Sequence, residues 1–381
     1  MKLMKTHSVI SDFTSFTYKH LLKPILFSFE PDSVHEFFLK TGQILGSYPL
    51  TRALTRWAFS FSDPMLEQKV CGITFTNPIG LSEGFDKDAN LVDILPGVGF
   101  GFHQVGTVTL DAYEGNPQPW LHRLQKTKSI VVYFGLKNIG ATKIINKLKN
   151  KNRQIPMSIS VGKTNSPKTV KTAAGVKDYY DCLKCFVDAE VGDFYTINIS
   201  CPNTFGGEPF TNERDLNVLL KKLSTIKTEK PVFIKMPINL SWREFDELLK
   251  IAVKYKVSGV IIGNLNKDKK DPTVTDKIPA GLKGSLSGRP TWRLSNALIS
   301  KTYQKYGQKL TIVGVGGVFS GADAYEKIRR GATLVQLITG MIFEGPSLIG
   351  SINRDLIDLL KRDGYESVTQ AIGAFHKESK L

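Results

Sequence analysis

The sequence predicts an α/β protein, a (β/α)8 TIM barrel with a small N-terminal helical domain. Two observations lead to this prediction. The chain has 381 residues, which accommodates one large barrel and a smaller appendage. From residue 66 onward, short apolar runs recur, and longer amphipathic stretches lie between most of them. The 41% hydrophobic content excludes a disordered chain, and four cysteines are too few for a disulfide scaffold of this size.

Residues 1–65 form the predicted N-terminal domain. Three segments combine basic residues with large apolar and aromatic ones: Phe13–Phe29, His35–Leu45 and Leu50–Phe61. Pro24 is expected to interrupt or bend the first segment, and Glu30–Ser33 offers a helix start to the second. Such helices either cap the core as a small bundle or lie in a bilayer interface, with Lys and Arg near anionic headgroups. The sequence contains no run long and apolar enough to span a membrane, and Met1–Ile10 lacks the features of a signal peptide.

Residues 66–381 form the predicted barrel. Its strands are expected to be continuous apolar runs, because both faces of a barrel strand are covered. The eight runs are Pro78–Leu81, Gly101–Val105, Pro156–Val161, Phe194–Ile199, Val232–Ile234, Gly259–Ile262, Leu310–Val313 and Leu334–Leu337. The stretches Asn212–Thr228 and Ser241–Tyr255 have helical periodicity. Lys143–Arg153 and Asn266–Ala280 are expected to be hydrophilic loops.

Functional groups of such a barrel gather at the C-terminal ends of its strands. Gly314–Gly317 follows the seventh run and Thr339-Gly340 follows the eighth. Glycines let backbone N–H groups approach an anion closely, so these two loops predict a phosphate site. The alternative is a pair of tight turns without a ligand.

Five polar residues at other strand ends are expected to face one cavity. They are Lys87, Asn198, Asn203, Lys235 and Asn264. Asn side chains offer both donors and acceptors, which suits a planar ligand with alternating C=O and N–H groups. Lysines suit a carboxylate or an electron-rich ring.

Cys201 is the candidate for proton transfer. It lies just past a buried run, and Pro202 stiffens its loop. A thiolate accepts a proton well if nearby lysines lower the pKa of the thiol. A buried structural cysteine is the alternative. Cys182 and Cys185 form a lone CxxC within a helical segment, where packing is the expected role, and no metal site is predicted.

Several motifs resemble those of dihydroorotate dehydrogenases, over about residues 17 to 376. The motifs are Asn77–Asp88 (NPIGLSEGFDKD), Gly99–Thr109 (GFGFHQVGTVT), Asn198–Thr204 (NISCPNT), Gly284–Pro290 (GSLSGRP), Val313–Val318 (VGVGGV), Gly331–Leu337 (GATLVQL) and Val368–Ala374 (VTQAIGA). The N-terminal segment Glu30–Phe37 (EPDSVHEF) is similar to the membrane-associated, quinone-linked class 2 enzymes. Soluble class 1 enzymes lack that extension.

The resemblance implies FMN as cofactor. The residues expected to surround it are Ser82, Gly84, Lys87, Gly106, Thr107, Ser160, Asn198, Lys235, Ser287, Gly288, Gly316, Gly317, Ile338 and Thr339. The implied reaction is the oxidation of dihydroorotate to orotate in pyrimidine synthesis. A base, here Cys201, would remove the C5 proton while hydride passes from C6 to flavin N5. Lys87, Asn198, Asn203 and Asn264 would hold the pyrimidine. A membrane quinone would then take the electrons, entering between the N-terminal helices near His35 and Arg123.

Some positions depart from the family pattern. Class 2 enzymes usually carry Ser as the base, whereas position 201 is Cys, the class 1 choice. Val132 stands where an Asn normally contacts the pyrimidine, and Ser160 where an Asn usually meets the flavin. Leu265 replaces a Thr or Ser, and Glu83 replaces a small residue beside the flavin. If buried, Glu83 would need a partner or a raised pKa.

The formal net charge of +16 is the remaining feature. It is compatible with nucleic acid, an anionic membrane surface or an acidic substrate. An RNA-acting barrel similar to dihydrouridine synthases is one alternative, and a divergent flavin barrel with another substrate or no activity is another. Little chain remains after Leu337 for an RNA-binding domain, so no nucleic-acid partner is expected. The predicted location is peripheral, on the cytoplasmic face of a membrane, because the few cysteines fit a reducing compartment.

Overall fold

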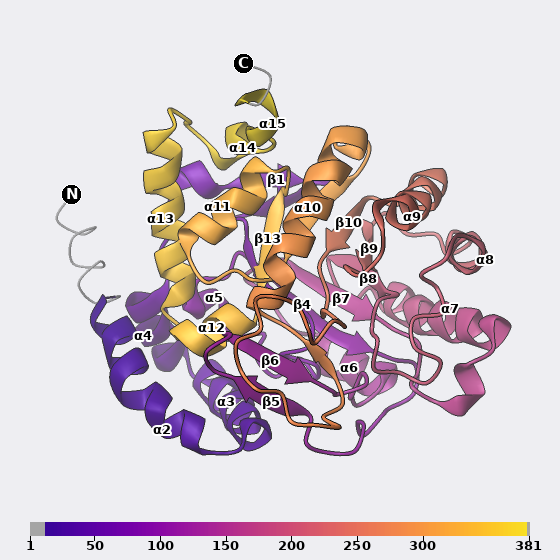
Figure 1. Cartoon of the computed structure of the whole chain (residues 1–381), viewed down its shortest axis with the longest axis horizontal. Coiled ribbons are helices and arrows are strands. Elements are labelled where there is room, and N and C mark those ends of the chain that lie inside the picture. Colours follow the sequence, from indigo (N-terminus) through magenta and orange to yellow (C-terminus); the bar gives the residue numbers. More distant parts are fainter. Residues whose placement is uncertain (1–11, 379–381) are drawn as a thin grey trace.

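Eight parallel strands close into a barrel in the computed structural model, which describes residues 12–378 (Figure 1). The strands are β3 (Ile79–Leu81), β4 (Phe102–Val108), β7 (Met157–Val161), β8 (Phe194–Asn198), β9 (Val232–Met236), β10 (Gly259–Ile262), β12 (Thr311–Val315) and β13 (Leu334–Leu337). Their order around the barrel is β10-β12-β13-β3-β4-β7-β8-β9. Each predicted run coincides with one strand, so the TIM-barrel prediction is confirmed.

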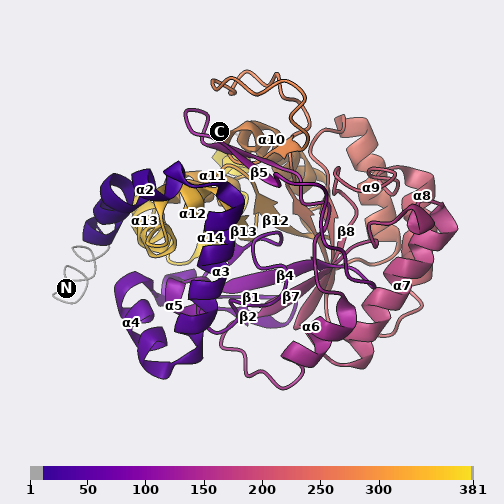
Figure 2. The ribbon, with the colours of Figure 1, turned by 90° about the horizontal axis from the view of Figure 1, so that it is seen from below.

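Helices surround the barrel and follow most of its strands (Figures 1 and 2). They are α5 (Leu95–Val98), α6 (Ala141–Leu148), α7 (Thr172–Asp188), α8 (Glu213–Leu223), α9 (Trp242–Lys254), α10 (Arg289–Tyr306), α11 (Gly321–Arg329), α12 (Thr339–Glu344), α13 (Leu348–Arg362), α14 (Val368–Ala371) and α15 (Phe375–Glu378). Side-chain caps start several of them: Asn212 caps α8, and Ser241 with Glu244 forms a capping box on α9.

The basic stretch Lys143–Arg153 is not the loop that was expected, because its first half belongs to α6. Ile144 and Leu148 of this helix are fully buried, whereas Lys143 is exposed. The lysines therefore occupy the outer face of an amphipathic helix, and its apolar face packs on the core.

The side chains inside the barrel are aromatic at its N-terminal end and polar toward its C-terminal end. Phe102, Phe194 and Phe233 close the N-terminal end together with Phe75, which belongs to the hairpin of β1 (Gln68–Val70) and β2 (Ile73–Phe75). Above them lies a buried hydrogen-bonded layer, in which Gln104 donates to Thr196 Oγ1 (2.6 Å). Inward-facing residues alternate along each strand, so Phe194 and Thr196 on β8 are followed at the top by Asn198. The C-terminal end is thus the polar end.

A second, antiparallel sheet stands outside the barrel. It contains β5 (Leu121–Leu124), β6 (Ser129–Val132) and β11 (Ser285–Leu286), in the order β11-β6-β5. Ile130 and Val132 of β6 line the cavity at the C-terminal end of the barrel. This sheet therefore covers the polar end and separates it from solvent.

The described N-terminal residues are helical. Their elements are the π-helical turn η1 (Tyr18–Leu22), α2 (Lys23–Ser28), α3 (Pro31–Ser47) and α4 (Pro49–Phe59). Pro24 lies in the first turn of α2, directly after the π turn, and Pro31 starts α3. The Tyr18 hydroxyl donates to the Ile342 carbonyl (2.6 Å), which ties this region to α12. The boundary after residue 65 stays a prediction.

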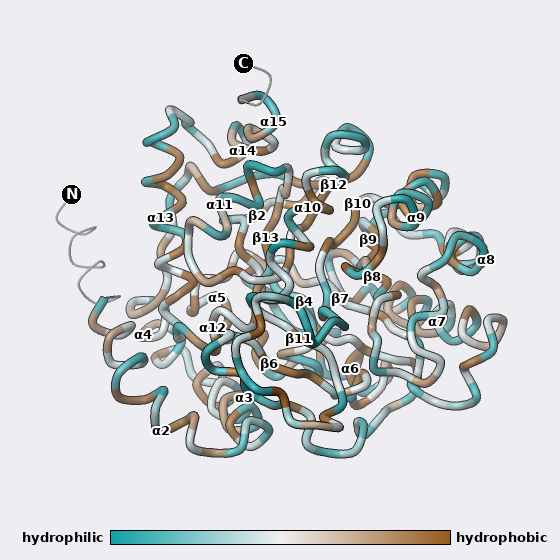
Figure 3. The backbone as a smooth tube through the Cα atoms, in the orientation of Figure 1, coloured by the Kyte–Doolittle hydropathy of each residue, from teal (hydrophilic) through white to brown (hydrophobic). Residues whose placement is uncertain are grey.

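These helices leave many large apolar side chains exposed. In Figure 3, brown hydrophobic stretches alternate with hydrophilic ones along the tube of these helices. The exposed set comprises Phe13, Phe16, Leu21, Leu22, Ile25, Phe29, Phe37, Ile44, Leu45, Tyr48, Leu50, Leu54 and Trp57. Within residues 12–378, no helix has the length and hydropathy needed to cross a bilayer. The predicted absence of a signal peptide concerns Met1–Ile10, which lie outside the described residues.

Candidate active site

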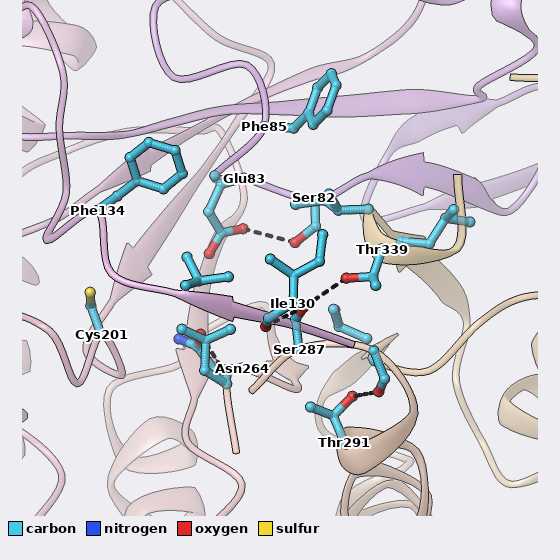
Figure 4. A pocket seen from close by; sticks show the side chains of 18 of the residues that line it. Ser82, Glu83, Phe85, Ile130, Phe134, Cys201, Asn264, Ser287, Thr291 and Thr339 are labelled. Atoms are coloured by element: carbon cyan, nitrogen blue, oxygen red, sulfur yellow. Dashed lines mark hydrogen bonds between the residues drawn. The ribbon is translucent and has the colours of Figure 1, made fainter. Parts of the chain in front are cut away.

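A cavity with about 1170 Å³ of empty space opens at the C-terminal ends of the strands (Figure 4). Most of the predicted site residues line it. They are His35, Ser82, Gly84, Lys87, Thr107, Asn198, Cys201, Asn203, Lys235, Asn264, Ser287, Gly288, Gly316, Gly317, Ile338 and Thr339. The five polar residues expected to converge on one space therefore do so, although they come from four different segments of the chain.

Three predicted residues lie elsewhere. Ser160 is fully buried behind Thr107, and their hydroxyl oxygens are 3.0 Å apart. The Gly106 carbonyl accepts a hydrogen bond from the N–H of Gly84 (2.7 Å). Gly106 therefore supports a residue that lines the cavity but does not line the cavity itself. Arg123 lines a neighbouring cavity. The roles assigned to these residues stay predictions.

The glycine loops form a cradle that larger residues would fill. Gly316 and Gly317 both have positive φ (105° and 71°), and a Cβ on Gly316 would come within 2.4 Å of Thr291 Oγ1. Across from them, the Thr339 hydroxyl donates to Ser287 Oγ (2.8 Å). Successive glycine N–H groups and hydroxyls are the donors that a phosphate requires, so this end of the cavity fits the phosphate of FMN.

Amide and hydroxyl groups line the centre of the cavity. Asn198 Nδ2 donates to Thr107 Oγ1 (2.7 Å), and Asn264 Nδ2 donates to the Ser200 carbonyl (2.7 Å). Asn203 Nδ2 donates to the Val132 carbonyl (2.9 Å), which joins its loop to β6. These bonds orient the three amides toward one space, where a flat ligand with C=O and N–H edges can pair with them.

A buried ion pair crosses the same space. Glu83 Oε1 lies 2.6 Å from Lys235 Nζ, and the two side chains are 3% and 6% exposed. Ser82 bridges them, because its Oγ donates to Glu83 Oε2 (3.4 Å) and accepts from Lys235 Nζ (3.2 Å). Figure 4 shows the Ser82–Glu83 bond in the middle of the cavity. The partner that a buried Glu83 was expected to need is thus Lys235.

Lys87 is the second cation of the cavity. Its Nζ lies 3.5 Å from the centroid of the Phe134 ring and 3.4 Å from His35 Nε2. Burial lowers the pKa of Lys87 to about 7. Burial, followed by the charge of Lys87, also holds the pKa of His35 well below its usual value. A neutral His35 can accept a hydrogen bond from Lys87 without charge repulsion. No motif or spacing in the sequence singles out Phe134 for this role.

Cys201 lies at the edge of the cavity, on the side of Phe134 (Figure 4). Burial raises the pKa of its thiol to about 11, and this effect outweighs the backbone hydrogen bond from Asn203 and the charge of Lys235, which both lower the pKa. A thiolate base needs nearby lysines to lower the pKa of the thiol. At Cys201 the lowering of the pKa by Lys235 is smaller than the rise caused by burial.

The loop after Cys201 is anchored by two residues that the sequence did not single out. Asn165 Oδ1 accepts the N–H of Phe205 (2.7 Å), and Lys163 Nζ donates to the Phe205 carbonyl (3.2 Å). Asn165 Nδ2 also donates to the Gly135 carbonyl (2.9 Å). The loop of Cys201 and the loop after β6 are thereby joined through one buried side chain.

A second, apolar cavity with about 650 Å³ of empty space lies between the N-terminal helices and the first. The two cavities share five lining residues: His35, Phe85, Leu121, Ile130 and Ile342. Arg123 stands at its wall, with Nη1 donating to the Phe29 carbonyl (2.7 Å). The two cavities are therefore adjacent, and the shared residues form the boundary between them.

A barrel whose open end offers a phosphate cradle beside a lysine- and amide-lined space is the arrangement expected of a flavin-dependent oxidoreductase. The family model "Dihydroorotate dehydrogenase" matches residues 65–360. The chain belongs to the dihydroorotate dehydrogenase family, whose cofactor is FMN. Among the described residues, no cluster of His, Cys, Asp and Glu could hold a metal ion.

Curated relatives and a solved structure agree with this family. A "Dihydroorotate dehydrogenase (quinone)" of Nostoc punctiforme is 34% identical over 378 residues, covering 95% of this chain and 99% of the relative. One of Myxococcus xanthus is 34% identical over 366 residues, covering 94% and 98%. The crystal structure of DHODH from Eimeria tenella in complex with ferulenol has a TM-score of 0.80 at 25% identity and covers 91% of this chain and 96% of that one.

Proposed function

We propose that this protein oxidises dihydroorotate to orotate with FMN as its cofactor and passes the electrons to a membrane quinone. The main support for the proposal is that the residues expected to act on the substrate converge on one cavity. The candidate base, two lysines and three asparagines line one cavity, and that cavity adjoins an apolar one beneath the N-terminal helices. The relatives named as quinone-type dihydroorotate dehydrogenases support the same substrate and acceptor.

The polar residues of the cavity would bind and orient the substrate. Asn198, Asn203 and Asn264 would pair with the C=O and N–H groups of the pyrimidine ring, and Lys87 with its carboxylate. A bound carboxylate would favour the charged form of Lys87, whose pKa burial lowers to about 7 in the chain alone. Substrate binding and protonation of Lys87 would therefore support each other.

Proton transfer falls to Cys201. Its thiolate would take the C5 proton of the substrate, and the loop that carries it is held at Phe205 by Asn165 and Lys163. FMN, when bound, supplies the acceptor for the hydride that leaves C6. The sheet of β5 and β6 contributes to the wall of the site and would limit the access of water to this step.

The apolar cavity would admit the quinone. Its lining of aliphatic and aromatic side chains suits an apolar ring, and His35 reaches both this cavity and Lys87. Arg123 stands at its wall as a charged group. The exposed apolar side chains of α2–α4, with Arg52 and Arg56 among them, would bring the entrance onto an anionic, cytoplasm-facing membrane surface.

The half-reaction tests the proposal. Purified protein should be yellow, and anaerobic dihydroorotate should bleach the flavin absorbance. Cys201→Ala should retain FMN but lose this bleaching at neutral pH, whereas Cys185→Ala, a half-buried cysteine on α7, should bleach like wild type. Wild-type bleaching in Cys201→Ala would refute the base assignment. If the wild-type protein is yellow but its flavin stays oxidised with dihydroorotate, the assignment of dihydroorotate as the substrate is refuted.

A further inference from the structure

The ion pair between Glu83 and Lys235 joins opposite walls of the barrel. Glu83 follows β3 and Lys235 lies on β9, and these two strands stand opposite each other in the strand order. Their charged atoms meet at 2.6 Å with almost no exposure to solvent. A charge pair in this position lies at the centre of the cavity floor rather than at its rim.

The backbone that carries Glu83 is fixed on both sides. The N–H of Ser82 donates to the Leu337 carbonyl of β13 (3.3 Å), and the N–H of Gly84 donates to the Gly106 carbonyl of β4 (2.7 Å). Glu83 is thus fixed between two barrel strands, and Ser82 Oγ contacts both partners of the pair. The carboxylate itself is held by Lys235 Nζ and Ser82 Oγ, so turning it toward solvent would break both contacts.

The pair matters because of the charge that a flavin gains on reduction. A buried ammonium beside the flavin attracts that negative charge strongly, since water screens it poorly. A carboxylate 2.6 Å from the ammonium cancels most of this attraction. The cavity floor is therefore close to neutral at Lys235, although a lysine on its own would make it positive.

We propose that Glu83 sets the reduction potential of the bound flavin by neutralising Lys235. The inference rests on the proposed function for the presence of FMN in this cavity. Glu83 acts through Lys235 and is a positioning residue. Its carboxylate lowers the potential, which makes electron transfer to the acceptor more favourable and reduction by the substrate less favourable.

Sulfite provides the test, because this anion adds to oxidised flavin and its affinity reports the positive charge nearby. In the FMN-loaded enzyme, Glu83→Gln and Glu83→Ala should each bind sulfite at least about tenfold more tightly than wild type. Their midpoint potentials, measured against a reference dye, should shift to more positive values. Glu83→Asp, which keeps the charge, should behave like wild type.

Glu247→Gln serves as the control, because it removes a carboxylate that pairs with Lys250 on the outer helix α9. It should change neither sulfite affinity nor potential. Unchanged sulfite affinity in both Glu83→Gln and Glu83→Ala would overturn the inference. Loss of flavin from both variants would overturn it too, because Glu83 would then serve cofactor retention.

The two proposals can fail separately. Reduction of the wild-type flavin by dihydroorotate is measured on its own. If dihydroorotate does not reduce the wild-type flavin while Glu83→Gln still tightens sulfite binding, the proposed substrate is wrong and the role of Glu83 stands. If dihydroorotate reduces the wild-type flavin and the variants bind sulfite as wild type does, only the role of Glu83 is wrong.

Discussion

Burial controls the proton affinity of the individual residues in this site. The pKa of Cys201 rises to about 11 and that of Lys87 falls to about 7, in both cases chiefly because removal from water disfavours the charged form. Nearby opposite charges act in the other direction but are weaker. Near pH 7 the site without substrate thus holds a protonated thiol and a lysine that is only about half protonated.

The raised pKa of the Cys201 thiol leads us to expect that the rate of flavin reduction depends on pH. Only the thiolate can accept the C5 proton, and below a pKa of about 11 its fraction grows about tenfold with each pH unit. The rate of flavin reduction at saturating dihydroorotate should therefore rise steadily from pH 7 to pH 9. Rapid-mixing measurements of flavin absorbance would show this. A rate independent of pH over that range would contradict it.

Most of the side chains proposed to act on the substrate lie on loops rather than on strands. Hydrogen bonds from other side chains hold these loops in position relative to one another. Asn165 is the clearest case, because one buried amide contacts both the loop of Cys201 and the loop after β6. Two hydrogen bonds of this kind contribute about 1 kcal/mol each. The geometry of the base therefore depends on a residue outside the cavity lining.

Asn165→Ala should lower kcat/KM for dihydroorotate by about tenfold, because the Cys201 loop loses its anchor at Phe205. Flavin content should stay at the wild-type level, since the phosphate cradle lies on other loops. Steady-state kinetics and the flavin absorbance ratio would test this. Asn217→Ala, which removes bonds to Lys254 and Tyr255 between α8 and α9, is the control and should leave kcat/KM unchanged.

The phosphate cradle makes a second prediction for a loop. Gly316→Ala should purify with much less FMN than wild type, because its Cβ would press on Thr291 and its φ of 105° disfavours a side chain. Gly364→Ala is the matched control. Gly364 also has a positive φ (77°), but no atom lies within 4 Å of its Cβ position. Equal flavin content in the two variants would argue against a cradle at Gly316.

Over the whole molecule, apolar surface is concentrated on the N-terminal helices. On α4, the side chains of Leu50, Leu54 and Trp57 are 70%, 55% and 58% exposed, and their spacing places them on one helical face. Arg52 and Arg56 lie on the same helix. An exposed apolar face with adjacent cations is the arrangement by which a helix binds an anionic membrane surface.

Replacing Leu50, Leu54 and Trp57 together by Ser should weaken co-sedimentation with anionic lipid vesicles several-fold, because the apolar area that enters the bilayer is lost. Reduction of the flavin by dihydroorotate should be unaffected, since these side chains line neither cavity. Val218→Ser, at an exposed apolar residue of α8, is the control and should bind vesicles like wild type. Unchanged vesicle binding in the triple variant would exclude α4 as a contact.

Local sequence was sufficient to locate the barrel strands and the loops that end them. Runs such as Gly259–Ile262 read as strands because a continuous apolar segment bounded by polar residues suits a strand covered on both faces. The site followed from the same rule, since the C-terminal ends of parallel strands meet at one end of a barrel. The sequence could not distinguish residues lining the cavity from those behind them, such as Ser160, because both follow the same strand pattern.

The sequence by itself thus determined the fold class and the set of polar residues that meet in the cavity. Only the tertiary structure decided how those residues act on one another. The pairing of Glu83 with Lys235 depends on barrel closure, which brings opposite strands together, and no local pattern records it. The pKa of Cys201 depends on how much surrounding protein removes the thiol from water. Strand formation is governed by nearby residues, whereas desolvation and charge pairing arise from contacts between distant ones.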